Sequence, residues 1–70
     1  MDRVQVVSTS LVGVGYDEQT ATLEVEFISG NVFQYGVPAE VHADLMAASS
    51  IGGFFNSSIR NAGYQFARMS

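Results

Sequence analysis

The chain has 70 residues, 47% of them hydrophobic, and a formal net charge of −4 at pH 7. A chain of this length holds one small core, and this composition is too apolar and too poor in charge for an intrinsically disordered protein. It has no cysteine and only three lysine or arginine residues, which excludes disulfide bonds, thiolate metal sites and a large basic surface for polyanions.

Residues 1–8 are expected to form an extended N-terminal segment of a single domain that spans residues 1–70. The start MDRVQVVSTSLVGVG has an acidic residue before its arginine and no clean apolar stretch ahead of a cleavage site, which argues against a signal peptide. No apolar run approaches the ~18 residues that a bilayer-spanning helix needs. We therefore expect a cytoplasmic protein that does not bind membranes.

Residues 10–37 carry the alternation of three short antiparallel strands. Apolar side chains alternate in SLVGVGY (10–16) and in TLEVEFI (22–28), where Glu24 and Glu26 mark the solvent side. The third run contains the aromatic pair Phe33 and Tyr35. The pattern predicts a β-meander with one apolar face.

The two connections set the register of these strands. A four-residue loop at 18–21 places Tyr16 opposite Leu23, and a three-residue loop at 29–31, with Asn31 in the left-handed conformation, places Phe33 opposite Phe27. One face then carries Val12, Val14, Tyr16, Leu23, Val25, Phe27, Phe33, Tyr35 and Val37. Phe33 and Tyr35 are thus predicted to face the core and not to stack on nucleic-acid bases, an inference that a slip by one residue would reverse.

Two helices are expected to cover the apolar face. Residues 38–48 have Pro38 at a first-turn position and an apolar stripe, and a shorter helix at 52–59 follows a cap at Ser49 or Ser50. The segments at 4–7 and 64–69 each either add a fourth strand or pack in extended form. The predicted fold class is α+β: a three-stranded antiparallel β-meander, open to a fourth strand from a terminus, packed on one face by two C-terminal helices.

A series of short motifs carries a family resemblance. They are VGYD (14–17), LEVEF (23–27) with Ser29-Gly30, the aromatic-x-aromatic at 33–35, Val37-Pro38, Phe55-Asn56 and Ile59-Arg60. In this order they resemble the KTSC domain, which is named for the C-terminus of some lysyl-tRNA synthetases. Phe33 replaces the first tyrosine of the family's Tyr-x-Tyr, and the often basic tail keeps one arginine here. The resemblance implies a small bacterial protein without an established function, for which attachment to a synthetase suggests RNA binding.

Four residues form the predicted binding patch. Asn56 and Arg60 lie one helical turn apart, Arg68 and Tyr64 follow in the tail, and a guanidinium offers a planar fork of donors to an anion or RNA. The simpler interpretation is that Arg60 pairs with a local carboxylate or carbonyl and that Asn56 serves a cap or turn.

No constellation for catalysis or metal binding can be assembled from the sequence. Glu40 and Asp44 share one side of the first helix, whereas His42 points roughly away from both. No serine lies in a G-x-S-x-G turn. We expect a protein that is not an enzyme and holds no metal and no cofactor.

The second face of the sheet is the predicted interaction face. Glycines inside a strand weaken it unless another group approaches closely, and Gly13 and Gly15 fall on this outer face. Three apolar residues lie near them: Leu11, Ile28 and Val32. This face could receive the terminal segments or another chain. The prediction is a small interaction module that binds a protein partner or itself; the alternative is a weak RNA-binding domain.

Overall fold

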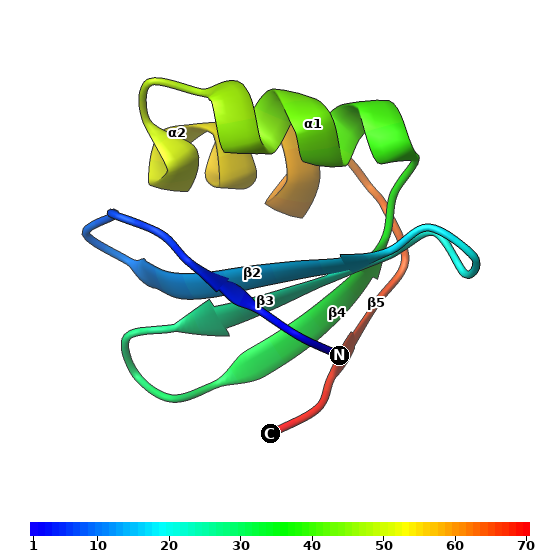
Figure 1. The fold of residues 1–70 in the computed structure, drawn as a ribbon, viewed down its shortest axis with the longest axis horizontal. Helices are drawn as coiled ribbons and strands as arrows, with labels where there is room; N and C mark the ends of the chain where they lie inside the picture. The colour runs from blue at the N-terminus through cyan, green and yellow to red at the C-terminus, as the bar shows by residue number, and fades with distance from the viewer.

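The computed structural model describes all residues 1–70 as one antiparallel sheet with a helical layer on one face (Figure 1). The sheet has the strand order β1-β2-β3-β4-β5. The elements are β1 (Val4–Gln5), β2 (Leu11–Asp17), β3 (Thr22–Phe27), β4 (Val32–Gly36), α1 (Ala39–Ala47), α2 (Ile51–Phe55), the π-helix η1 (Asn56–Arg60) and β5 (Phe66–Arg68). The α+β class and the two-layer arrangement are as predicted.

The sheet has five strands, not three or four, because both terminal segments join it. Val4 pairs with Val14 on β2, and Phe66 pairs with Tyr35 on β4. The backbone groups at the edges of a three-stranded meander need hydrogen-bond partners. The terminal segments supply those partners at both edges, which alternation alone left undecided.

The register of the first hairpin is confirmed over most of its length. Tyr16 lies opposite Leu23 and Val14 opposite Val25, with residues 18–21 as the loop. The pairing of Val12 with Phe27 is wrong, because a bulge between Leu11 and Gly13 brings Leu11 opposite Phe27. A bulge adds one residue to a strand and so reverses the face of the residues beyond it.

The second hairpin is displaced by two residues from the predicted register. Gly30 and not Asn31 has the positive φ, of 95°, and Phe33 lies opposite Val25. A shift of two keeps every side chain on its face, whereas a shift of one would have reversed them. The predicted inward orientation holds: Tyr35 is 4% exposed, and Phe33 is half-buried against the core.

The helical layer begins one residue later than predicted, with Pro38 extended before the first turn and not part of it, and it ends in an irregular turn. Pro38 is the residue before α1, and the side chain of Ser50 accepts a hydrogen bond of 3.2 Å from the Gly53 amide. After Phe55 the helix widens, and the amide of Asn61 bonds to the carbonyl of Asn56, five residues back. No helix has the length and apolarity to cross a bilayer.

The core lies between the sheet and the helical layer. Nine buried residues form it: Leu11, Val14, Leu23, Val25, Tyr35, Val37, Leu45, Phe55 and Ile59. Phe55 has edge-to-face contacts with both Phe27 and Tyr35, at centroid distances of 5.6 and 5.4 Å. This ring therefore ties the second helix to the rings of the sheet.

The N-terminal segment covers the outer face of β2. A Cβ atom on Gly13 would lie 3.4 Å from the Cβ of Arg3, and one on Gly15 would lie 2.5 Å from the carbonyl oxygen of Asp2. Gly15 is therefore needed for this close approach, whereas a methyl group on Gly13 would meet the Arg3 side chain near ordinary contact distance. Arg3 also forms ion pairs with Glu24 and Glu26 on the same face, the second with 3.4 Å between Nε and Oε1.

Glu24 makes the stability of the fold depend on pH. Burial by itself raises its pKa, but hydrogen bonds from Gln34 and Arg3 together with the charge of Arg3 outweigh burial and lower the pKa below 4.5. A carboxyl group with a lowered pKa stabilises the fold above its unfolded-state pKa and loses that contribution as pH falls through the folded-state value. We expect the free energy of unfolding to fall below pH 4.5, and to fall less in Glu24→Gln. Urea unfolding at a series of pH values measures this; an identical acid response in both proteins would contradict it.

Candidate functional site

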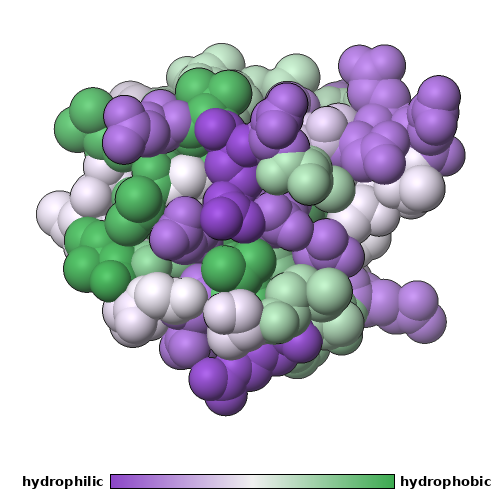
Figure 2. Space-filling model, turned by 60° about the horizontal axis from the view of Figure 1, so that its bottom comes forward, coloured by the Kyte–Doolittle hydropathy of each residue, from purple (hydrophilic) through white to green (hydrophobic).

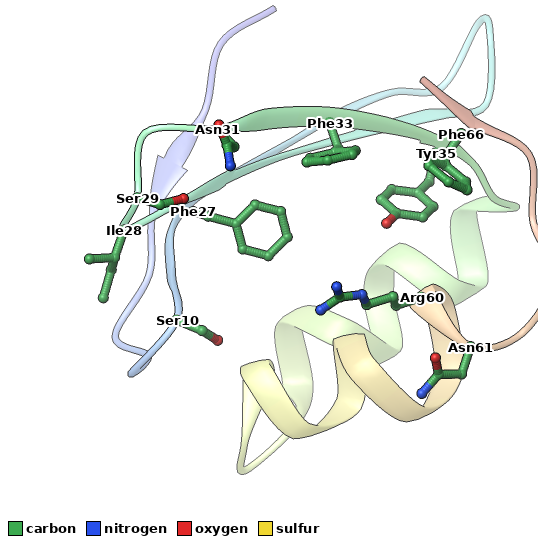
Figure 3. A pocket seen from close by; sticks show the side chains of 10 residues that line it. All are labelled: Ser10, Phe27, Ile28, Ser29, Asn31, Phe33, Tyr35, Arg60, Asn61 and Phe66. Atoms are coloured by element: carbon green, nitrogen blue, oxygen red, sulfur yellow. The ribbon is translucent and has the colours of Figure 1, made fainter. Parts of the chain in front are cut away.

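A groove with a volume of about 650 Å³ opens between the inner face of the sheet and the end of η1 (Figure 3). We call it the aromatic groove, because four of its lining residues are rings. It is lined by Ser10, Phe27, Ile28, Ser29, Asn31, Phe33, Tyr35, Arg60, Asn61 and Phe66. Volumes of about 300–1,000 Å³ are usual for ligand pockets.

The aromatic side of the groove is built by three neighbouring strands. Phe27 and Phe33 meet edge to face at a centroid distance of 5.7 Å. Phe66 on β5 stacks on Tyr35, with centroids 5.3 Å apart and planes at 25°. The alternation of strand side chains places the rings of β3 and β4 on the inner face, and pairing of β5 with β4 adds the last ring.

Arg60 projects into the groove from the opposite side. It is the last residue of η1, and its side chain reaches into the space between the helix and the sheet rings (Figure 3). No hydrogen bond or ion pair links its guanidinium to the rest of the chain, whereas Arg3 pairs with Glu24 and Glu26 and Arg68 bonds to Asn31. Arg60 is the free arginine of this protein.

Tyr35 presents a second unused donor to the same space. The residue is 4% exposed, its hydroxyl has no hydrogen-bond partner in the chain and is open to the groove, and Figure 3 shows it directed toward the side of the groove that Arg60 occupies. Burial raises the pKa of Tyr35 above 10.0, and the nearby charge of Arg60 opposes this. The hydroxyl is therefore protonated at neutral pH and can donate.

The groove differs in charge from the rest of the molecule. None of its lining residues is a carboxylate, although the chain has seven Asp and Glu residues and a net charge of −4. Glu24 and Glu26 lie on the opposite face of the sheet, where Arg3 pairs with them. The free guanidinium therefore gives the groove a local positive charge.

The structure brings only one residue of the predicted binding patch into the groove. Asn56 borders a different hollow, between residues 7–10 and the start of α2, and does not line the aromatic groove with Arg60. Arg68 is held by the Asn31 side chain at 3.0 Å and by the Ser70 carbonyl at 3.3 Å, and Tyr64 packs against the core. The four residues do not form one patch.

The predicted interaction face is not an open apolar surface. Leu11 is 1% exposed and belongs to the core, because the bulge turns it inward. Gly13 and Gly15 lie under the N-terminal segment, and Val32 is buried at 9% exposure. Ile28 alone is well exposed, at 62%, and it lines the aromatic groove.

Figure 2 brings the sheet side of the molecule forward and agrees with this placement. Hydrophilic residues cover much of the middle of this face, and hydrophobic residues gather mainly toward the left, with a smaller group near the centre. The ion pairs of Arg3 with Glu24 and Glu26 belong to the outer sheet face. The groove was not predicted from the sequence, because one of its four aromatic side chains, Phe66, joins it only when β5 pairs with β4. The position of Phe66 in the alternating C-terminal segment was the one feature of the sequence that pointed to it.

Fold and groove define a single-domain α+β protein with a five-stranded antiparallel sheet and one helical layer. The KTSC domain family matches residues 7–64, and the chain belongs to that family. It is 41% identical to an uncharacterised protein of Stutzerimonas stutzeri over 99% of both chains. The chain is also similar to a crystal structure of a KTSC domain protein from Yersinia pestis, with 31% sequence identity and a TM-score of 0.92. The match covers 99% of this chain and 97% of that one.

One relative carries the domain within a much longer protein. A lysine–tRNA ligase of Nostoc punctiforme is 41% identical over 56 residues, which are 79% of this chain and 10% of that protein. The similarity concerns the domain and not the rest of the ligase. All of these relatives are bacterial.

Proposed function

We propose that this domain is a non-catalytic interaction module that binds a protein partner through the aromatic groove. The observation that carries the proposal is the free guanidinium of Arg60 beside four rings, with no carboxylate in the lining. Tyrosine and arginine are enriched among the residues that dominate the free energy of protein association. Exposed hydrophobic side chains at the groove, Ile28 and Phe66, extend this contact area.

The chemistry of the lining supports binding over catalysis. The groove contains Ser10 and Ser29 but no histidine, aspartate, glutamate or lysine that could take a proton from a hydroxyl nucleophile. His42 lies elsewhere, with its ring stacked on Tyr16 at a centroid distance of 4.6 Å. Binding uses the groups that are present, whereas a reaction would need groups from elsewhere.

Loss of the free guanidinium is the sharpest test of this function. Partners captured from a bacterial lysate on the immobilised domain are expected to bind Arg60→Gln at least about tenfold more weakly, because a charged hydrogen bond is worth roughly 1.5–3 kcal/mol. Gln19→Glu changes the net charge by the same amount in an exposed loop away from the groove and is expected to retain the partner. Binding constants of the recovered partner measure this.

Two results would contradict the proposed function. One is equal partner binding by the native domain and Arg60→Gln. The other is the absence of any captured protein, together with a monomeric mass by size-exclusion chromatography and light scattering. A dimer that Arg60→Gln dissociates would show that the partner is a second copy of this chain.

RNA binding is the second candidate, and Phe66 is the observation that favours it. This ring is 62% exposed and lies on the same strand as Arg68, which suits stacking of a base next to a phosphate contact. The net charge of −4 places this candidate second. Two phosphate contacts predict that affinity for tRNA falls only about sevenfold between ~50 and ~200 mM salt. No binding at low salt, or binding that Arg60→Ala leaves unchanged, removes this candidate.

A further inference from the structure

We infer that the aromatic groove recognises a carboxylate joined to an apolar side chain, as at the C-terminal end of a partner polypeptide. The inference rests on the proposed function, since it uses the same groove, and it adds the chemical group that the groove selects. Two donors without partners in the chain, the Arg60 guanidinium and the Tyr35 hydroxyl, face this space, and an apolar floor lies beside them.

The two donors suit a carboxylate in number and in charge. The guanidinium of Arg60 is a planar fork that matches the two oxygens of a carboxylate. The hydroxyl of Tyr35, which its raised pKa keeps protonated, supplies one further hydrogen bond. Tyr35 is 4% exposed as a residue, but its hydroxyl is not a buried unsatisfied group: it reaches the open groove, where an oxygen of the ligand takes the place of water.

The aromatic side chains of the sheet select the apolar part of the ligand. Phe27 and Phe33 form an edge-to-face pair at 5.7 Å, and Phe66 covers Tyr35. A leucine or phenylalanine side chain packed against these rings would lose its contact with water, which is the main source of affinity for such a contact. A last residue carries this side chain and the carboxylate on one Cα, so both reach the groove together.

A phosphate group fits the same site less well. One guanidinium balances the single charge of a carboxylate and leaves a phosphate monoester undercompensated. The chain has no lysine to add, and Arg60 is the one unpaired cation at the groove. The groove therefore favours a carboxylate over a phosphate.

The experiment uses the whole chain and a set of matched peptides, followed by two-dimensional amide NMR. One hexapeptide with a Gly-Ser body ends in leucine with a free carboxylate, a second is the same peptide with a C-terminal amide, and a third ends in glycine with a free carboxylate. A hexanucleotide RNA is the fourth probe. The free-acid leucine peptide is expected to shift the amide signals of Phe33, Tyr35 and Arg60, and to bind at least about tenfold more tightly than either other peptide.

Variants separate the two donors from general effects on the fold. Arg60→Gln is expected to weaken the free-acid peptide about tenfold, and Arg60→Lys less, since lysine keeps the charge and loses the fork. Tyr35→Phe is expected to weaken it about threefold without lowering the melting temperature, because the hydroxyl bonds to no group of the chain and is open to solvent. Gln19→Glu is expected to bind like the native domain.

The outcomes distinguish this inference from the proposed function. Equal binding of the acid and the amide would overturn carboxylate recognition and leave the groove as a protein-binding site. The same holds if no peptide binds but Arg60→Gln still loses the partner from the lysate. Shifts of the groove signals by RNA and not by any peptide would overturn both and favour the second candidate.

Discussion

Replacing Phe55 by alanine is expected to lower the free energy of unfolding by about 3–5 kcal/mol, the usual cost of removing a buried ring. Phe55 is 1% exposed and contacts Phe27 and Tyr35 edge to face. At roughly 0.05–0.15 kcal/mol per residue, a 70-residue domain has a total stability of only about 4–10 kcal/mol. The variant should therefore be partly unfolded at moderate urea concentrations, where the native chain is still folded.

Phe66→Ala is the matched control for that measurement. Phe66 is 62% exposed and stacks on one face of Tyr35, so its loss is expected to cost less than about 1.5 kcal/mol. Both variants are compared by urea unfolding followed by circular dichroism. A Phe55→Ala variant as stable as Phe66→Ala would show that the helical layer is not fixed through this ring.

Gly15→Ala is expected to have the second large effect, a loss of about 1–3 kcal/mol, because the new methyl group overpacks a backbone contact. Its Cβ atom would lie 2.5 Å from the Asp2 carbonyl oxygen, and backbone cannot yield as a flexible side chain does. The N-terminal segment must move away, which pulls Arg3 from Glu24 and leaves that buried carboxylate with the Gln34 hydrogen bond.

Alanine substitutions at two other glycines test whether the loss of stability follows the distance from the new Cβ to its nearest neighbour. No atom lies within 4 Å of the position that a Cβ on Gly36 would occupy, so Gly36→Ala should be neutral or slightly stabilising. Gly13, with its nearest contact at 3.4 Å, should fall between the two. Urea unfolding ranks the three variants, and amide NMR signals of residues 2–5 report the position of the segment. Equal stability of Gly15→Ala and Gly36→Ala would refute the close approach.

The fold could be predicted where local chemistry decides the structure. The polar loop at 18–21 fixed most of the first hairpin, and the side chain of Ser50 caps α2 as expected. In the second hairpin the predicted orientation of the side chains was right, although the predicted residue pairs were wrong. Placing the left-handed residue at Asn31 instead of Gly30 moved the register by two, and side-chain orientation in a strand repeats every two residues.

The site could not be predicted because it depends on contacts between distant segments. The bulge beside Leu11 reverses that residue, and nothing in its neighbours signals an extra residue in the strand. Phe66 joins the groove only because β5 pairs with β4, and the π-helix turn sets where Arg60 emerges. The sequence identified Arg60 as a binding candidate, but it did not show which rings surround the guanidinium.

The terminal strands have a consequence for how copies of this protein meet. The edge strands of the sheet are short: β1 has two residues and β5 has three. A strand from another molecule therefore finds very few unpaired backbone groups with which to form hydrogen bonds. Continuous fibre-like growth of one sheet into the next is thereby discouraged. Concentrated solutions of the domain should therefore not form fibres in which sheets of neighbouring molecules join edge to edge. The longer strands β2 and β4 would pair more readily if β1 and β5 did not cover them.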